Sequence, residues 1–206
     1  DQLGDILIDA SGIDTIKSYL TWTLAAPFEN LSLLGSGALN ATGNNAGNVL
    51  RGNGAANILS GLGGNDTLDG GTGSGDTLNG GLGNDTFVLD AAGDILLDSG
   101  GIDTIYSAFS LTLGASFERL LLTGTGATSG TGNAAANTIT GNTAANRLKG
   151  LTGNDIVSGG GGRDTIEGGA GNDTLTGGAD ADNFVFNTAL SAVANLDRVS
   201  DFYVPL

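Results

Sequence analysis

Aspartate side chains recur at a fixed nine-residue spacing near the end of the chain, at Asp155, Asp164, Asp173 and Asp182. A glycine-rich stretch precedes nearly every one of them, and an apolar residue follows two places later. Carboxylates and backbone carbonyls supply oxygen ligands, which hard divalent cations such as Ca²⁺ prefer. The chain has no Cys and no His, which excludes zinc sites with nitrogen or sulfur ligands as well as cysteine or histidine catalysis. The spacing therefore points to repeated cation binding.

The charge of the chain supports the same chemistry. The formal net charge is −15, from 22 acidic and 7 basic residues. Nucleic acid is not expected as a partner, because phosphate contacts need clustered Lys and Arg. No apolar run is long enough to span a bilayer, and the sequence shows no N-terminal signal peptide. Because Asp1 begins in the middle of the repeat pattern, we expect the chain to be a fragment of a longer protein.

The nine-residue word extends through most of the chain. Its acidic form also occurs earlier, at Asp66, Asp76, Asp85, Asp94 and Asp103, with one extra residue between the first two. Asparagine holds the same position at Asn48, Asn57, Asn137 and Asn146. All 15 in-register Asp or Asn positions have an apolar residue two places later. A disordered glycine-rich linker would not keep this period, so the pattern predicts a repeat architecture.

Short strands and tight turns must position these carboxylates. Nine residues can supply one strand of three to five residues and one turn, so two words form one coil. Glycine allows the positive φ values that such turns need. Stacked parallel coils lie about 4.8 Å apart, which places each aspartate over the one in the next coil. The expected pairs are Asp66/Asp85, Asp76/Asp94, Asp85/Asp103, Asp155/Asp173 and Asp164/Asp182.

Paired carboxylates at this spacing repel each other by roughly 3 kcal/mol at an effective dielectric constant near 20, and a cation between them reverses the sign. Calcium fits the carbonyl-rich turns better than magnesium, which prefers a tighter octahedron and retains waters. The predicted carboxylate ligands are Asp66, Asp76, Asp85, Asp94, Asp103, Asp155, Asp164, Asp173 and Asp182. The predicted carbonyl ligands belong to the turn glycines Gly64, Gly81, Gly83, Gly153, Gly160, Gly162, Gly169 and Gly171.

The chain also repeats on a longer scale. Gly93–Ser107 matches Gly4–Ser18 at a constant offset of 89, and the match continues from Glu29 onto Glu118. We expect a first module over residues 1–89, a second over 90–190, and a trailing edge or cap over 191–206. The modules contain stretches outside the nine-residue word, Thr15–Leu34 and Thr104–Thr123, which predict wider solenoid coils.

Asparagine words carry no charge and few turn glycines, so hydrogen-bonded ladders without metal are favoured there over weak calcium sites. The aromatic residues Tyr19 and Trp22 could stack on a sugar, but covering the side of a sheet is the favoured interpretation.

Three words carry a specific resemblance: GGLGNDTFV (80–88), GGGGRDTIE (159–167) and GGAGNDTLT (168–176). They match the motif G-G-x-G-x-D-x-U-x, and the chain resembles RTX (repeats-in-toxin) calcium-binding proteins of the haemolysin type. The resemblance implies an all-β fold, a right-handed parallel β-roll or β-solenoid with about two nonapeptides per coil and Ca²⁺ in the turns. It also implies an extracellular or cell-surface bacterial protein, exported by a type I system without an N-terminal signal peptide and unfolded until it meets calcium.

We therefore expect a calcium-dependent structural or spacer module of a surface layer, adhesin or filament, without enzymatic activity. Its expected partners are calcium, neighbouring copies and cell-surface polysaccharide. One alternative is the export and folding tail of a secreted hydrolase.

Another alternative is a polysaccharide-active β-solenoid enzyme that would use the acids outside the repeat, Glu29, Glu118 and Glu167. We expect Glu118, beside Arg119, to be a solvated strand edge instead. A polar binding face for ice or carbohydrate would need a regular row of threonines, and the row that Thr131 and Thr140 suggest breaks at Lys149.

Overall fold

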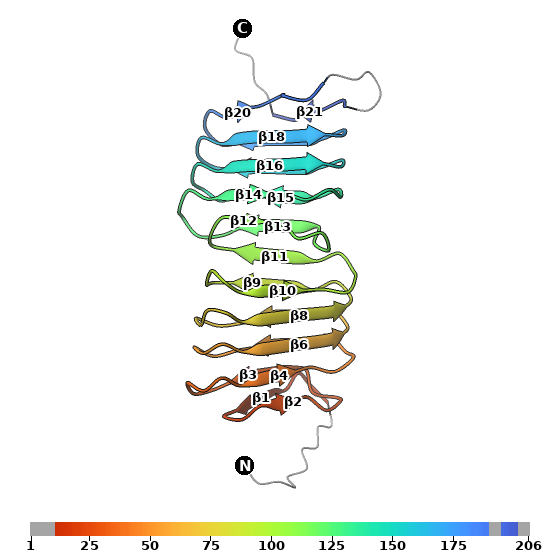
Figure 1. Cartoon of the computed structure of the whole chain (residues 1–206), viewed down its shortest axis with the longest axis vertical. Coiled ribbons are helices and arrows are strands. Elements are labelled where there is room, and N and C mark those ends of the chain that lie inside the picture. The colour runs from red at the N-terminus through yellow and green to blue at the C-terminus, as the bar shows by residue number, and fades with distance from the viewer. Residues whose placement is uncertain (1–10, 190–194, 202–206) are drawn as a thin grey trace.

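The computed structural model describes residues 11–189 and 195–201, and within these ranges the chain is all-β without a helix. Short parallel strands stack into one column, with Thr15–Ser18 (β1) near the lower end in Figure 1 and Arg198–Val199 (β21) near the upper end. The strands form three sheets, one of eleven strands and two of five strands each. This architecture is a parallel β-solenoid, which confirms the predicted fold class.

The eleven-stranded sheet, which we call the long sheet, runs through the whole column in the order β1-β3-β5-β7-β9-β11-β13-β15-β17-β19-β21. Its strands are β1 (Thr15–Ser18), β3 (Asn30–Leu33), β5 (Val49–Arg51), β7 (Thr67–Asp69), β9 (Thr86–Leu89), β11 (Thr104–Ser107), β13 (Arg119–Leu122), β15 (Thr138–Thr140), β17 (Ile156–Gly160), β19 (Thr174–Gly178) and β21 (Arg198–Val199).

The opposite wall of the column consists of the two five-stranded sheets, one after the other. The first short sheet contains β2 (Trp22–Thr23), β4 (Asn40–Thr42), β6 (Ile58–Gly63), β8 (Thr77–Leu82) and β10 (Ile95–Leu97). The second short sheet contains β12 (Leu111–Thr112), β14 (Ser129–Thr131), β16 (Arg147–Thr152), β18 (Thr165–Ala170) and β20 (Asn183–Phe184).

The strand register confirms that two nine-residue words form one coil. Leu50 pairs with Leu68, and Val157 pairs with Leu175, each 18 residues further along the chain. The step from Leu68 to Phe87 is 19 because the chain has one extra residue before Asp76. The long sheet therefore absorbs the insertion in a turn and keeps its strands aligned.

Apolar side chains two places after each Asp or Asn fill the interior of the column, as the sequence predicted. The fully buried ones are Leu50, Leu59, Leu68, Leu78, Phe87, Ile105, Ile139, Leu148, Val157, Ile166 and Leu175. Ile16, Leu96 and Phe184 are partly buried against this core. The alternation of inward and outward side chains along each strand accounts for the pattern. Leu7 lies outside the described residues.

Along the long sheet, the coils that begin in the stretches outside the nine-residue word contain fewer residues than the others, so the prediction of wider coils was wrong there. Thr15 pairs with Asn30, and Thr104 pairs with Arg119, each a step of 15 residues. A tight turn replaces a glycine-rich one, since the N–H of Phe117 donates to the carbonyl of Gly114 at 3.2 Å. The ring of Phe117 is buried and contacts Phe87 edge-on, with 5.3 Å between ring centroids.

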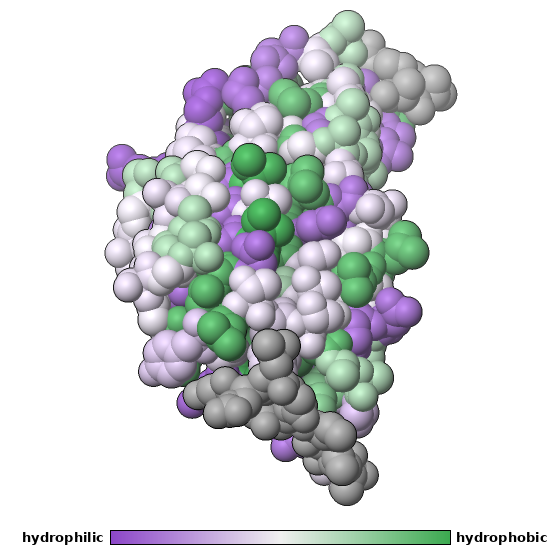
Figure 2. Space-filling view, turned by 60° about the horizontal axis from the view of Figure 1, so that its bottom comes forward, coloured by the Kyte–Doolittle hydropathy of each residue, from purple (hydrophilic) through white to green (hydrophobic). Residues whose placement is uncertain are grey.

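The outer surface carries scattered apolar side chains among small polar ones, as Figure 2 shows. Trp22 packs partly buried against the core, whereas Tyr19 is exposed. Thr131 pairs with Lys149 in the second short sheet, and Thr140 pairs with Ser158 in the long sheet. The two threonines therefore belong to different walls and form no common row.

Candidate metal centres

Each acidic word places its aspartate in the turn directly before a strand, so the aspartates line up in two rows along the column. Strands of the long sheet follow Asp66, Asp85, Asp103, Asp155 and Asp173, which we call the long-sheet row. Strands of the short sheets follow Asp76, Asp94, Asp164 and Asp182, which we call the short-sheet row. The structure therefore brings all nine predicted carboxylates into the turns between coils.

A hydrogen bond joins the two members of every predicted aspartate pair. The backbone N–H of one aspartate donates to Oδ1 of the aspartate in the next coil. These distances are 2.7 Å for Asp66/Asp85, 3.0 Å for Asp76/Asp94, 2.6 Å for Asp85/Asp103, 2.8 Å for Asp155/Asp173 and 2.9 Å for Asp164/Asp182. Each carboxylate therefore reaches back to the coil before it, and this contact fixes its orientation.

The second oxygen of these carboxylates has no partner. Oδ2 is buried and unpaired in Asp66, Asp76, Asp85, Asp103, Asp155, Asp164 and Asp173. An unpaired buried carboxylate oxygen is costly, and buried charges are normally paired or bound to metal. Seven such oxygens in regular rows match the donors that a hard divalent cation requires.

A backbone carbonyl lies near several of these unpaired oxygens. The Cα of Gly61 faces both Oδ2 of Asp66 and the carbonyl oxygen of Gly80 in the next coil, so a Cβ at Gly61 would collide with Asp66 and lie 2.6 Å from that carbonyl. The first glycines of two further turns, Gly150 and Gly159, face their own aspartate and a carbonyl of the next coil in the same way.

Sequence reasoning missed these first-glycine carbonyls and named other glycines of the turns instead. All eight glycines that it named have positive φ, between 88° and 140°. Among the residues that the structure describes, three non-glycine residues adopt the left-handed conformation: Leu62 at a φ of 80°, Leu151 at 86° and Asp180 at 78°. The first two stand where the motif has its second glycine, and Asp180 stands where it has its fourth. The turn backbone is thus kept even where the glycine is absent.

Burial raises the pKa of the seven row aspartates whose Oδ2 is buried and unpaired. The pKa of Asp66 and of Asp155 rises to about 6, mainly because burial disfavours the charged form, against the opposing hydrogen bonds from the N–H groups of Asn48 and Asn137. Burial also raises the pKa of Asp103 to about 7. The ionised rows are therefore destabilised when nothing neutralises them.

Asparagine words satisfy the same turns with amide groups. In the first of them, Oδ1 of Asn48 accepts the N–H of Asn44 at 2.7 Å, and its Nδ2 donates to the carbonyl of Phe28 in the preceding coil at 3.3 Å. Asn57, Asn137 and Asn146 make the equivalent pair of contacts. These contacts are the hydrogen bonds of the predicted ladders, with the amide nitrogen donating to the carbonyls of the preceding turn, and the absence of metal from the asparagine words stays a prediction.

A second asparagine in each of these turns was not expected. Oδ1 of Asn133 accepts the N–H of Ala135 at 2.8 Å, and its Nδ2 donates to the carbonyls of Gly114 and Phe117 at 2.7 Å. Asn44, Asn53 and Asn142 form the same local turn and also donate to the preceding coil. The signal in the sequence was the shared pattern G-N-x-x-x-N.

Glutamates occupy the aspartate position in the two 15-residue coils, so the expectation that Glu118 is a solvated strand edge was wrong. Its Oε2 accepts the N–H of Asp103 at 2.9 Å, and Glu29 accepts the N–H of Asp14 at the same distance. The longer side chain reaches back across a coil that lacks the glycine-rich turn.

Near the C-terminal end, Oδ1 of Asp197 accepts the N–H of Asp173 at 3.1 Å across a 24-residue step.

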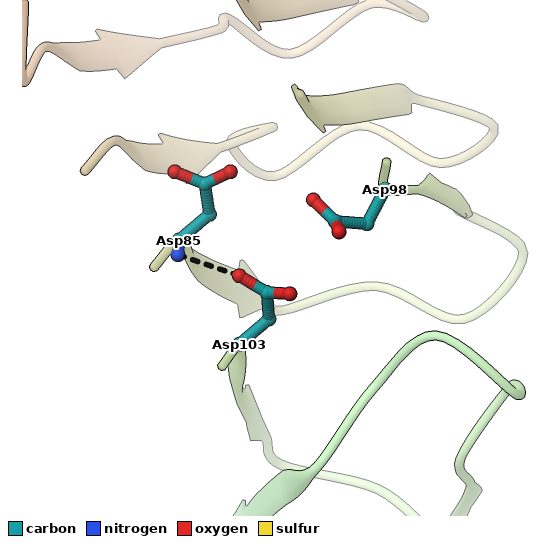
Figure 3. Close-up of side chains that lie close together, drawn as sticks. All are labelled: Asp85, Asp98 and Asp103. Carbon is teal, nitrogen blue, oxygen red and sulfur yellow. Dashed lines mark hydrogen bonds between the residues drawn. The ribbon is translucent and has the colours of Figure 1, made fainter. Parts of the chain in front are cut away.

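One group of three carboxylates stands apart within the described part of the chain. Asp85, Asp98 and Asp103 each place one carboxylate oxygen within 4.8 Å of the other two (Figure 3). Asp85 and Asp103 were predicted ligands, whereas Asp98 was not, because it lies outside the nine-residue spacing.

Comparison with known families identifies the repeat. The family model described as the RTX calcium-binding nonapeptide repeat (4 copies) matches residues 42–75, 71–96, 131–166 and 158–187, which together cover more than half of the chain. No curated protein gives a match. Within the described residues, no helix is long and apolar enough to cross a membrane.

Proposed function

The chain belongs to the RTX calcium-binding nonapeptide repeat family, and from this premise we propose that several calcium ions bind in its turns and that their binding completes folding. The observation that carries the proposal is the set of seven buried, unpaired Oδ2 atoms in regular rows. The proposed carboxylate ligands are the nine aspartates of the long-sheet and short-sheet rows. Carbonyls of the turn glycines complete the ligand set.

The residues of the chain determine why folding depends on the cation. Oδ1 of each aspartate is held by the N–H of the preceding coil, so its Oδ2 is fixed in the buried turn. Glycine-rich turns add a large conformational entropy cost, because glycine loses more freedom on folding than other residues. Calcium, when bound, supplies the positive charge that pairs with the buried oxygens. Binding to the folded state alone then stabilises that state by mass action.

We propose that the module serves as a stiff spacer in an extracellular or cell-surface protein. The long sheet continues through the whole column without a break, which supports an arrangement in which the two modules, residues 1–89 and 90–190, extend one another in a line. Such a column holds its two ends at a fixed distance and in a fixed direction, which suits a surface layer, an adhesin or a filament. The acids outside the repeat hold structural contacts, since Glu118 accepts the N–H of Asp103 and Glu167 pairs with Lys149 at 2.8 Å. This observation favours a structural role over carbohydrate hydrolysis.

Circular dichroism during a calcium titration tests the proposal. Calcium-free chain at pH 8 is expected to lack most of its β-signal and to gain it cooperatively as CaCl₂ is added to the millimolar range. MgCl₂ at the same concentrations is expected to produce much less, because Mg²⁺ requires a tighter octahedral site. A complete β-signal in excess chelator would refute the proposal.

A pair of matched variants separates the turn sites from general charge effects. Asp155→Asn removes one buried carboxylate from the long-sheet row, whereas Asp90→Asn removes the same charge from an exposed position outside both rows. The first variant is expected to bind at least one ion fewer in calorimetry, and the second is expected to match the unmodified chain. Equal losses in both variants would show that net charge, and not the turn geometry, controls folding.

A further inference from the structure

Within the described residues, Asp85, Asp98 and Asp103 are the three carboxylates whose oxygens all lie within 4.8 Å of one another. The three carboxylates converge (Figure 3), and each contributes one buried oxygen without a partner: Oδ2 of Asp85, Oδ1 of Asp98 and Oδ2 of Asp103. Asp85 is 1% exposed and Asp103 is 0% exposed, so neither carboxylate is solvated. The turn thus holds three negative groups with inward-facing free oxygens, where an ordinary pair of coils holds two.

The chain places Asp98 where other turns have a glycine. Asp98 lies five residues before Asp103, and the glycines Gly80 and Gly168 lie five residues before Asp85 and Asp173. In those turns the glycine carbonyl is the oxygen near the unpaired Oδ2 of the preceding coil. At this turn a Cβ on Gly80 would instead lie 2.8 Å from Oδ1 of Asp98. A charged carboxylate therefore takes the place of a neutral carbonyl.

Local contacts hold Asp98 in this orientation. Its Oδ2 accepts the N–H of Gly100 at 2.7 Å, which leaves Oδ1 directed at the two row aspartates. The oxygens of Asp85 and Asp103 are fixed by the ladder, since Oδ1 of Asp103 accepts the N–H of Asp85 at 2.6 Å. All three ligand atoms are thus preorganised by backbone hydrogen bonds.

The cluster of Asp85, Asp98 and Asp103 lies where the first module meets the second. It lies between β9 and β11, where the last acidic coil of residues 1–89 meets a 15-residue coil that carries Glu118 instead of an aspartate. Asp9 and Asp14 correspond to Asp98 and Asp103 at the offset of 89. Asp9 itself lies outside the described residues, but the sequence repeats the feature once per module.

We propose that Asp85, Asp98 and Asp103 form a cation site of higher charge than the other turns, which binds Ca²⁺ more tightly and prefers trivalent lanthanide ions, and which joins one module to the next. The inference rests on the proposed calcium binding and assigns to Asp98 a ligand role outside the nonapeptide motif. Three carboxylates attract a trivalent ion more strongly than two do, because the Coulomb energy scales with the product of the charges. Ligand charge count is also a main determinant of calcium affinity.

Two variants of the whole chain test this assignment. Asp98→Asn keeps an oxygen for the N–H of Gly100 and removes one charge, and Asp90→Asn serves as the control, because it removes the same charge from an exposed side chain outside the proposed ligand set. In calorimetric titrations with Ca²⁺ and with Tb³⁺, the unmodified chain is expected to show one site that is filled first. Asp98→Asn is expected to weaken that site on the order of tenfold or more, and Asp90→Asn is expected to leave it unchanged. In crystals that contain less than one Tb³⁺ ion per protein chain, anomalous scattering is expected to locate the first ion at this cluster.

The outcomes separate this inference from the proposed function. If Asp98→Asn binds both ions as the unmodified chain does, the role of Asp98 is wrong while calcium binding in the turns stands. A first Tb³⁺ peak at another turn would have the same meaning. If the unmodified chain binds no calcium, the proposed function fails and this inference fails with it.

Discussion

Acidification of the calcium-free chain is expected to favour folding, which is the reverse of ordinary acid denaturation. Protonation removes the charge from the buried aspartates, so it replaces part of what a bound cation does. Burial raises the pKa of Asp66, Asp76, Asp85, Asp103, Asp155, Asp164 and Asp173. A group whose pKa is higher in the folded state takes up protons on folding, so the folded state gains stability as the pH falls toward the unfolded pKa.

Two aspartates set the magnitude. The pKa of Asp66 and of Asp155 rises from 3.8 to about 6, and both side chains are 1% exposed. A shift of about 2 pH units corresponds to about 3 kcal/mol for each group. Between pH 7 and pH 4 the calcium-free folded state should therefore gain about 5 kcal/mol from these two residues alone, because at pH 4 the unfolded carboxyls are only partly protonated. That gain is comparable with the whole stability of a small domain, about 5–15 kcal/mol.

Far-UV circular dichroism of calcium-free protein from pH 8 to pH 4.5 measures the effect. The β-signal is expected to increase as the pH falls through 6, without added metal. The double variant Asp66→Asn/Asp155→Asn keeps the Oδ1 acceptors and is expected to lose a large part of this pH dependence. If the unmodified chain is less folded at pH 5 than at pH 8, the argument from buried, unpaired carboxylates is wrong.

Two further predictions concern the turns themselves. Leu62 has a φ of 80°, and Leu62→Gly should raise the free energy of unfolding in saturating calcium by about 1 kcal/mol, because glycine accepts this conformation without a Cβ penalty. Urea unfolding measures this gain. The control variant Leu82→Gly, at a residue without positive φ, should give no such gain. Asn137→Asp should destabilise the coil by about 1–3 kcal/mol even in calcium, because an oxygen replaces the Nδ2 that donates to the carbonyl of Phe117. Urea unfolding also measures this loss. An unchanged urea midpoint would contradict the proposed role of the amide.

Much of the fold could be predicted because the nine-residue period fixes both the inward side chains and the stacking partners. Once two words are assigned to one coil, Asp155 must lie over Asp173, and Val157 must pack on Leu175. These relations depend only on spacing and on the alternation of strand side chains. For this reason the register survived the extra residue before Asp76, which a turn accommodates.

The 15-residue coils could not be predicted in the same way, because their length depends on packing inside the column. The buried ring of Phe117 contacts Phe87 and replaces part of a turn. The role of Glu118 follows from that shorter step, which brings the residue into register with Asp103. The offset of 89 that relates Glu29 to Glu118 was the available signal, since both acids recur in the same place.

Asparagine and aspartate side chains differ in whether the preceding turn can satisfy their hydrogen-bonding groups. Both side chains stand in the same turn position, and the turn before them presents carbonyl oxygens. An amide nitrogen donates to such a carbonyl directly, as Asn57 does to Leu39 at 2.7 Å, so an asparagine coil is satisfied by the chain alone. An aspartate offers a second oxygen, which repels the same carbonyls and stays unpaired unless a cation bridges them.

The order of asparagine coils and acidic coils along the chain determines which coils are expected to need calcium. The acidic coils that follow Asn48 and Asn137 stack on coils whose own polar groups are satisfied, and the N–H groups of these asparagines hold Oδ1 of Asp66 and Asp155 at 2.7 Å. Because each coil of a solenoid contacts mainly its neighbours, the asparagine coils supply a surface with satisfied polar groups on which the acidic coils stack. Under the proposed function, calcium has to stabilise the acidic coils and not the asparagine coils, which makes folding of the column sensitive to the cation without requiring every coil to bind one.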